Sequence, residues 1–359
     1  MAPNSTSSVS PGSAPLVLRV RSAVEWLGVP IAADDLSPLS EQPYFIVDLR
    51  GDSGVVDEAL VAGARAALVQ LPCVTIGLGP VAATRAAAEL ASALDVVLDE
   101  RADLDRVIER VTTWPHAASM LAQTLRLGSH LPISHGLFAE SLAYGTLLDG
   151  AEHRAWLGAR PPRRHQPPHR EPAVLASRTG DRLDLTLNRA AKRNAYSAEM
   201  RDALLAGLDI ALGDDSLRLV VISGAGPSFC AGGDLDEFGT HPDLATSHAI
   251  RTARAAGRSI AACAERVRFE VHGACIGAGV ELAAFASRVV AKPDSLFELP
   301  ELSMGLIPGA GGTVSLPRRI GRQRTAFLAL SGARIDAATA LAWGLVDEIA
   351  ENEGEGTDG

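Results

Sequence analysis

A proline-dense segment near the middle of the chain, PPRRHQPPHREP at 161–172, divides the sequence into two halves. Its five prolines exclude a helix, because proline lacks the backbone N–H and fixes φ, and they favour an extended tether. We therefore place the domain boundary there, between a module at 16–160 and a domain at 173–350. The polar ends, residues 1–15 and 351–359, are expected to be disordered.

Both halves alternate short apolar runs with alanine-rich stretches, which predicts an α/β fold with parallel, helix-covered sheets. In the first half we expect the order β-α-β-α-β, with strands at Tyr44–Leu49, Cys73–Leu78 and Leu94–Asp99 and helices at Val55–Leu68 and Val81–Ala93. Two longer helical stretches should follow, at Leu104–Arg126 and Ile133–Leu157. Pro115 should break or kink the first of the long stretches. In the second half we expect strands at Leu183–Leu187, Leu219–Ser223, Phe269–His272 and Arg288–Ala291. We also expect a helix from about Ser197, which should cap it in part, and a helix over Val280–Ser287.

Composition excludes several classes of protein. The net charge of −10 argues against nucleic-acid binding, which needs a basic surface. No apolar run reaches the roughly 20 residues of a membrane span, and the N-terminus lacks the order of a secretory signal. The four cysteines show no metal-binding or disulfide spacing. These observations predict a reduced, cytoplasmic protein that binds neither membrane nor metal.

Three glycine-rich or acidic segments of the second half could carry chemistry: Gly224–Leu235 (GAGPSFCAGGDL), Gly273–Glu281 (GACIGAGVE) and Phe297–Gly312 (FELPELSMGLIPGAGG). Each has an ordinary structural explanation in isolation. The first could be a turn that needs positive φ, the acid of the second could simply stabilise a helix N-terminus, and the acids of the third could be exposed in a loop. Together they supply amide-rich turns and two carboxylates, Glu281 and Glu301. Such a set can stabilise an enolate and move a proton.

Residues 173–350 resemble the enoyl-CoA hydratase/isomerase (crotonase) superfamily. The resemblance rests on four segments in the family's order, LTLNRAAKRNAYSAEM (185–200), SFCAGGDL (228–235), GACIGAGVELA (273–283) and FELPELSMGLIPGAGGTVSLPRRIG (297–321). It implies a crotonase-like β-β-α superhelix in the C-terminal half, preceded by a smaller α/β and helical module.

The resemblance also implies roles for individual residues. The two oxyanion-hole amides fall on Ala231 and Ala278, the latter where the family usually has glycine, and the two catalytic carboxylates on Glu281 and Glu301. The positions near coenzyme A (CoA) and the acyl thioester are Lys192, Arg193, Ala195, Gly232, Gly233, Asp234 and Leu235.

The implied activity is hydration of a 2-enoyl-CoA thioester, as in fatty acid β-oxidation. No metal or redox cofactor is expected, because CoA is part of the substrate. The family further implies a homo-oligomer, a trimer or a hexamer. An isomerase or thioester hydrolase of the same family, and a non-catalytic acyl-CoA-binding or scaffold protein, are the alternatives.

The first half resembles parts that the second half lacks. Residues 94–129 and 133–163 are similar to the family's terminal helices, and 72–100 loosely resemble the region of the second oxyanion loop without its carboxylates. We therefore expect a shortened, catalytically empty relative at 44–163, whose helices complete the second half. An independent helical cap is the alternative.

Overall fold

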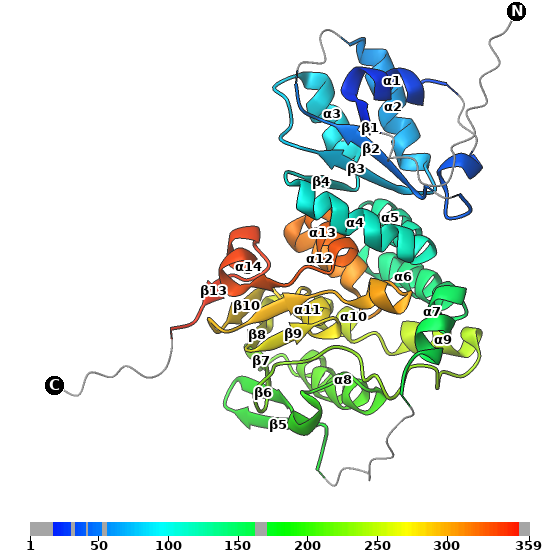
Figure 1. Ribbon diagram of the computed structural model, residues 1–359. Coiled ribbons are helices and arrows are strands. Elements are labelled where there is room, and N and C mark those ends of the chain that lie inside the picture. Colours follow the sequence, from blue (N-terminus) through cyan, green and yellow to red (C-terminus); the bar gives the residue numbers. More distant parts are fainter. Residues whose placement is uncertain (1–16, 30–32, 41, 52–55, 162–170, 352–359) are drawn as a thin grey trace, which may run out of the picture. The chain divides into compact units, whose positions relative to one another are not determined.

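The computed structural model describes residues 17–29, 33–40, 42–51, 56–161 and 171–351 (Figure 1). The predictions for the two ends of the chain and for most of the proline-dense segment lie outside these residues. The chain forms two compact units, Met1–Pro115 and His116–Gly359. This division differs from the predicted boundary at 161–172. The reason is that the helices after Pro115 pack against elements of the second half, as described below.

The first unit is a four-stranded parallel sheet in the order β1-β2-β3-β4, blue to cyan in Figure 1. Its elements are β1 (Val17–Arg19), α1 (Val20–Leu27), the 3₁₀ turn Ala33–Leu36, β2 (Tyr44–Asp48), α2 (Glu58–Gln70), β3 (Val74–Leu78), α3 (Arg85–Ala93), β4 (Val96–Leu98) and α4 (Arg101–Thr113). The predicted β-α-β-α-β order is confirmed from Tyr44 onward. The pair β1 and α1 was not predicted, because arginines interrupt its apolar run.

Local sequence accounts for the helices of this unit. Asp57 and Thr84 cap α2 and α3, since each side chain accepts hydrogen bonds from backbone N–H groups of the first turn. Helix α1 buries Val20, Val24 and other apolar residues at helical spacing. Together these features anchor the helices in one apolar core that also contains Phe45 and Leu68.

The second unit begins with helices and continues into two sheets. Its helices are α5 (Pro115–Gly128), α6 (Ile133–Leu148), α7 (Ala151–Gly158), α8 (Ala198–Gly213), α9 (Leu244–Ala253), α10 (Ala256–Ala262), α11 (Ala278–Ala283), α12 (Gly312–Ile320), α13 (Arg322–Ser331) and α14 (Ala337–Trp343). Pro115 starts α5, as its missing N–H allows at a first helical position, so the predicted break is confirmed.

One sheet has six strands in the order β13-β10-β8-β7-β6-β5, and the other has three in the order β12-β11-β9. The strands are β5 (Val174–Thr179), β6 (Arg182–Leu187), β7 (Leu219–Gly224), β8 (Val267–Val271), β9 (Ala274–Ile276), β10 (Arg288–Ala291), β11 (Leu296–Glu298), β12 (Ile335–Asp336) and β13 (Glu348–Ile349). Pairing is parallel except at β5–β6 and β11–β12. The predicted α/β class is confirmed.

Helices α5–α7 belong to the second unit although they precede the proline-dense segment. Helix α6 contacts α9, α10 and α12, and α7 contacts the 3₁₀ turn Glu301–Met304, labelled η4. The buried His153 ring of α7 donates a hydrogen bond from Nδ1 to the carbonyl of Met304, at 2.8 Å. None of the described helices is long and apolar enough to cross a bilayer.

Candidate active site

The turn between β6 and α8 is held in an unusual backbone conformation. Arg193 and Asn194 both have left-handed φ angles, 52° and 53°. The Asn194 side chain stabilises this shape, because its Oδ1 accepts from the Arg189 N–H at 2.7 Å while its Nδ2 donates to Ala225 O and Ser228 O. Asparagine tolerates left-handed φ better than most residues. The turn that carries Lys192, Arg193 and Ala195 is therefore fixed from within the fold.

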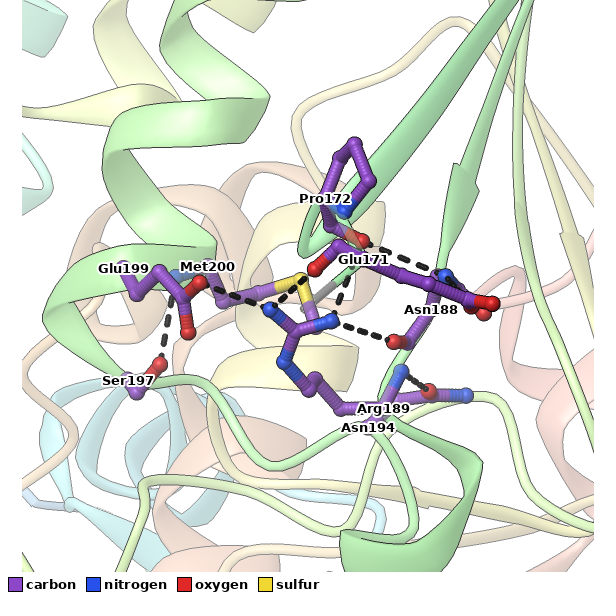
Figure 2. A network of polar contacts seen from close by, with 8 residues as sticks. All are labelled: Glu171, Pro172, Asn188, Arg189, Asn194, Ser197, Glu199 and Met200. Carbon is purple, nitrogen blue, oxygen red and sulfur yellow. Dashed lines mark hydrogen bonds and ion pairs between the residues drawn. The ribbon is translucent and has the colours of Figure 1, made fainter. Parts of the chain in front are cut away.

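A buried arginine anchors the same turn to its neighbours. Figure 2 shows the Arg189 guanidinium donating to the carbonyls of Glu171, Pro172 and Asn188 and to the Glu199 carboxylate in the first turn of α8. Ser197, which caps α8 as predicted, accepts from the Met200 N–H in the same view. This network connects the start of the second half to α8 and holds the turn in place.

Lys192 connects the turn to the glycine-rich loop that follows β7. Its Nζ lies 2.8 Å from Asp234 Oδ2 and 3.0 Å from Asp236 Oδ2. In addition, Tyr196 and Gly233 form an isolated parallel bridge. Two segments singled out from the sequence thus lie side by side, and Lys192 and Asp234 are bound to each other.

The backbone of the glycine-rich loop corrects one predicted role. Cys230 pairs with β9, donating to Ala274 O at 3.0 Å, and the Ala231 N–H donates to Arg193 O at 2.9 Å. Because that N–H is already used within the protein, Ala231 cannot serve as an oxyanion donor as predicted. Gly233, two residues on, lines the cavity described below, and its N–H makes no hydrogen bond within the described residues. It is the available donor of this loop.

The second predicted donor is available. Ala278 is the first residue of α11, so its N–H has no partner within the helix. Gly277 before it adopts φ 50°, whereas Ala278 lies outside the positive-φ region, so an alanine causes no backbone strain there. The departure from the family's usual glycine at this position is therefore compatible with the amide's role.

Glu281 projects from the first turn of α11 and is 2% exposed. Its Oε2 accepts hydrogen bonds from the N–H groups of Ala310 and Gly312, at 2.7 and 2.8 Å. Burial and the nearby carboxylates of Glu301 and Glu140 raise its pKa well above the ordinary range, while the two amides act in the opposite direction. The two amides hold this carboxyl in a fixed orientation, and its surroundings stabilise the protonated form more than they would in an exposed glutamate.

Glu301 begins the turn η4, after Pro300. Its Oε2 is buried and makes no hydrogen bond within the described residues. Burial raises its pKa to about 8. A side chain at Gly277 would approach Glu301 Oε1 to 2.5 Å, so Glu301 lies directly beside the start of α11. A neutral carboxylic acid, able to donate a proton, is the expected form at pH 7.

A third carboxyl, which the sequence analysis missed, belongs to α6. Glu140 is 3% exposed and accepts from Gly311 N, Thr313 N and Thr313 Oγ1, at 2.8, 2.9 and 2.6 Å. Burial raises its pKa to about 7. Alternate amides of residues 310–313 thus hold two carboxylates, Glu281 and Glu140. A single acid within the otherwise largely apolar helix ISHGLFAESLAYGTLL was the signal available in the sequence.

These groups share one cavity of about 460 Å³. The residues that line it and were predicted from the sequence are Gly233, Asp234, Ala278, Glu281 and Glu301. Other predicted residues, which do not line it, are Lys192, Arg193, Ala195, Ala231, Gly232 and Leu235. Two available amides and buried acids around one cavity can stabilise negative charge on an oxygen and transfer protons nearby.

Comparison with known proteins matches residues 183–354 to the family model described as Enoyl-CoA hydratase/isomerase. Over 176 residues the chain is 36% identical to a 1,2-epoxyphenylacetyl-CoA isomerase of Escherichia coli, covering 48% of this chain and 67% of the relative. A 2,3-dehydroadipyl-CoA hydratase of the same organism is 37% identical over 49% and 68% of the two chains. A crystal structure of enoyl-CoA hydratase from Thermoplasma volcanium aligns with a TM-score of 0.47 and 35% identity, over 51% and 73%.

Proposed function

The chain belongs to the enoyl-CoA hydratase/isomerase family, and we propose that it is an enoyl-CoA hydratase. In the proposed reaction, water adds across the 2,3 double bond of a 2-enoyl-CoA thioester. One observation supports this most strongly: Glu281 and Glu301 line the same cavity as the amides of Gly233 and Ala278.

The two amides would bind the thioester carbonyl oxygen. Negative charge accumulates on that oxygen as the water oxygen bonds to Cβ, and donors already in place stabilise it without reorganisation. Removing one such donor in other enzymes lowers kcat by about 100- to 1,000-fold. Gly233 takes the role first predicted for Ala231, since the Ala231 N–H is bonded to Arg193 O.

Glu281 and Glu301 would divide the proton transfers. We assign Glu281 as the base that accepts a proton from water, because the amides of Ala310 and Gly312 hold its Oε2 in place and oppose the rise in pKa that burial causes. Glu301 lacks such donors at Oε2 and has a pKa raised to about 8, which suits an acid that delivers a proton to Cα. The hydroxyl of water thereby bonds to Cβ and the proton of Glu301 bonds to Cα, which leaves Glu281 protonated and Glu301 ionised. Transfer of one proton from Glu281 to Glu301 would then restore the starting state.

The proposed chemistry needs no metal or redox cofactor, because the thioester carbonyl is activated by hydrogen bonds and no electrons are exchanged. The proposed substrate is an acyl-CoA. We also propose, from family membership, a cytoplasmic trimer or hexamer, whose mass in solution can be measured directly.

The proposal is tested by following the absorbance of the conjugated enoyl thioester during incubation with short 2-enoyl-CoAs. Glu281→Gln and Glu301→Gln should each lower kcat by about 100- to 10,000-fold while retaining binding of the substrate. Glu265→Gln is the control, since Glu265 is exposed and does not line the cavity. Wild-type rates in both variants would contradict the assignment.

The product identifies the reaction within the family. A mass gain of one water indicates a hydratase, an unchanged mass with a shifted double bond indicates an isomerase, and release of free CoA indicates a thioester hydrolase. Tight binding of CoA thioesters without any product would instead support a binding protein.

A further inference from the structure

The wall of the cavity formed by α9 carries a buried cation. Arg251 lines the cavity, and its guanidinium carbon lies 3.9 Å from the centre of the Tyr144 ring on α6. Its Nε and Nη2 are buried and make no hydrogen bond to any described residue. Buried guanidinium nitrogens without partners are costly, so these two nitrogens call for an explanation such as a bound acceptor.

The acids around Arg251 are already bound elsewhere. Glu140 is the acid whose charge acts on Arg251, yet both Glu140 oxygens accept hydrogen bonds from Gly311 and Thr313. Glu281 Oε2 is held by the amides of Ala310 and Gly312. No acid within the described residues forms an ion pair with Arg251.

The other arginines that line the cavity differ in this respect. Arg201 and Arg254 both pair with Asp202, at 2.8 and 2.6 Å. Arg251 is therefore the arginine of the described cavity wall that lacks an acidic partner. Its guanidinium lies over the Tyr144 ring, and the planar guanidinium group matches the geometry of a carboxylate.

We propose that Arg251 binds a carboxylate at the far end of the acyl chain, so that the preferred substrate is the CoA monothioester of an unsaturated dicarboxylic acid. The inference rests on the proposed function, since the thioester end must lie at Gly233 and Ala278. The hydroxyl-bearing Ser141 and Ser247 also line the cavity and give its wall the polarity that a charged group requires.

The test compares two six-carbon substrates that differ only at the far end, 2-hexenoyl-CoA and 2-hexenedioyl-CoA. Wild type should prefer the dicarboxylic substrate by about 10- to 100-fold in kcat/KM, as expected for a charge-assisted hydrogen-bonded pair. Arg251→Met should abolish this preference, mainly through KM, while still converting 2-hexenoyl-CoA. Arg251→Lys should retain part of it.

Arg254→Met is the matched control, because it removes a paired cation from the same cavity and should leave the substrate ratio unchanged. An equal ratio in wild type and Arg251→Met, or a wild-type preference for 2-hexenoyl-CoA, would overturn the proposal. Calorimetric binding of the saturated pair, adipyl-CoA and hexanoyl-CoA, tests Arg251 independently of turnover. If wild type converts neither enoyl thioester but Arg251→Met loses selective adipyl-CoA binding, the hydratase assignment fails and the carboxylate site stands.

Discussion

Replacing Glu140 by glutamine should change how the stability of the protein depends on pH. Burial raises the pKa of Glu140 from 4.5 to about 7, against the hydrogen bonds from Thr313 and Gly311. In the unfolded chain this carboxyl is hydrated and ionises near its ordinary pKa. Between the two values the folded protein binds more protons than the unfolded chain, so the free energy of unfolding decreases as pH rises.

The expected magnitude follows from the two pKa values. One unit of difference corresponds to about 1.36 kcal/mol, and partial titration at both ends leaves a loss of about 2.5 kcal/mol from Glu140 between about pH 5 and about pH 8. Burial also raises the pKa values of Glu281 and Glu301, so the total loss in the wild-type protein should be larger. Because Glu140 also raises the pKa values of Glu281 and Glu301, subtracting the variant from the wild type gives the share of Glu140 together with its effect on those two acids.

The assay is urea unfolding followed by tryptophan fluorescence at several pH values, for wild type and Glu140→Gln. Glutamine leaves at least one buried N–H of residues 311–313 without an acceptor, which costs about 1–3 kcal/mol at every pH. The advantage of wild type over the variant should therefore shrink as pH rises. Glu265→Gln, at an exposed position, is the control. An advantage that stays constant from pH 5 to pH 8 would refute the burial argument.

Three further predictions address the site and its support. In the full-length enzyme, kcat/KM should fall above about pH 8 as Glu301 loses its proton, and this limb should disappear from the residual activity of Glu301→Gln. Gly277→Ala should lower kcat by at least about tenfold, because Gly277 has φ 50° and a Cβ would lie 2.5 Å from Glu301 Oε1; an unchanged kcat would show that the loop can move. Residues 173–359 expressed alone should aggregate or be inactive, because they lack α6 and with it Glu140; a monodisperse, fully active fragment, judged by chromatography and turnover, would contradict this.

Residues with strong local signals were predicted well from the sequence. Ser197 was expected to cap a helix and does so, and Pro115 was expected to break one and does so. Glu281 and Glu301 were taken from a family resemblance, and both line one cavity. For Ser197 and Pro115 the relevant information lies within a few residues along the chain.

Individual hydrogen bonds between residues far apart in the sequence were not predicted. The sequence places Ala231 within the right loop, but only the folded chain reveals that its N–H donates to Arg193 O, 38 residues earlier. Glu140 lies 171 residues before Gly311, the amide that it accepts from. The predicted boundary at 161–172 differed from the compact units for the same reason, since proline content reports local stiffness and not which helices pack together.

The support of both proposed catalytic acids depends on helices that precede the family-matched segment 183–354. Within residues 310–313, Glu140 of α6 accepts from the amides of the second and fourth residues, and Glu281 accepts from the amides of the first and third. His153 of α7 binds the carbonyl of Met304, at the end of the turn that Glu301 begins. A change in α6 or α7 should therefore alter proton transfer without touching a residue of the matched segment. Part of the support of the proposed catalytic acids thus comes from helices outside the segment that carries the acids themselves.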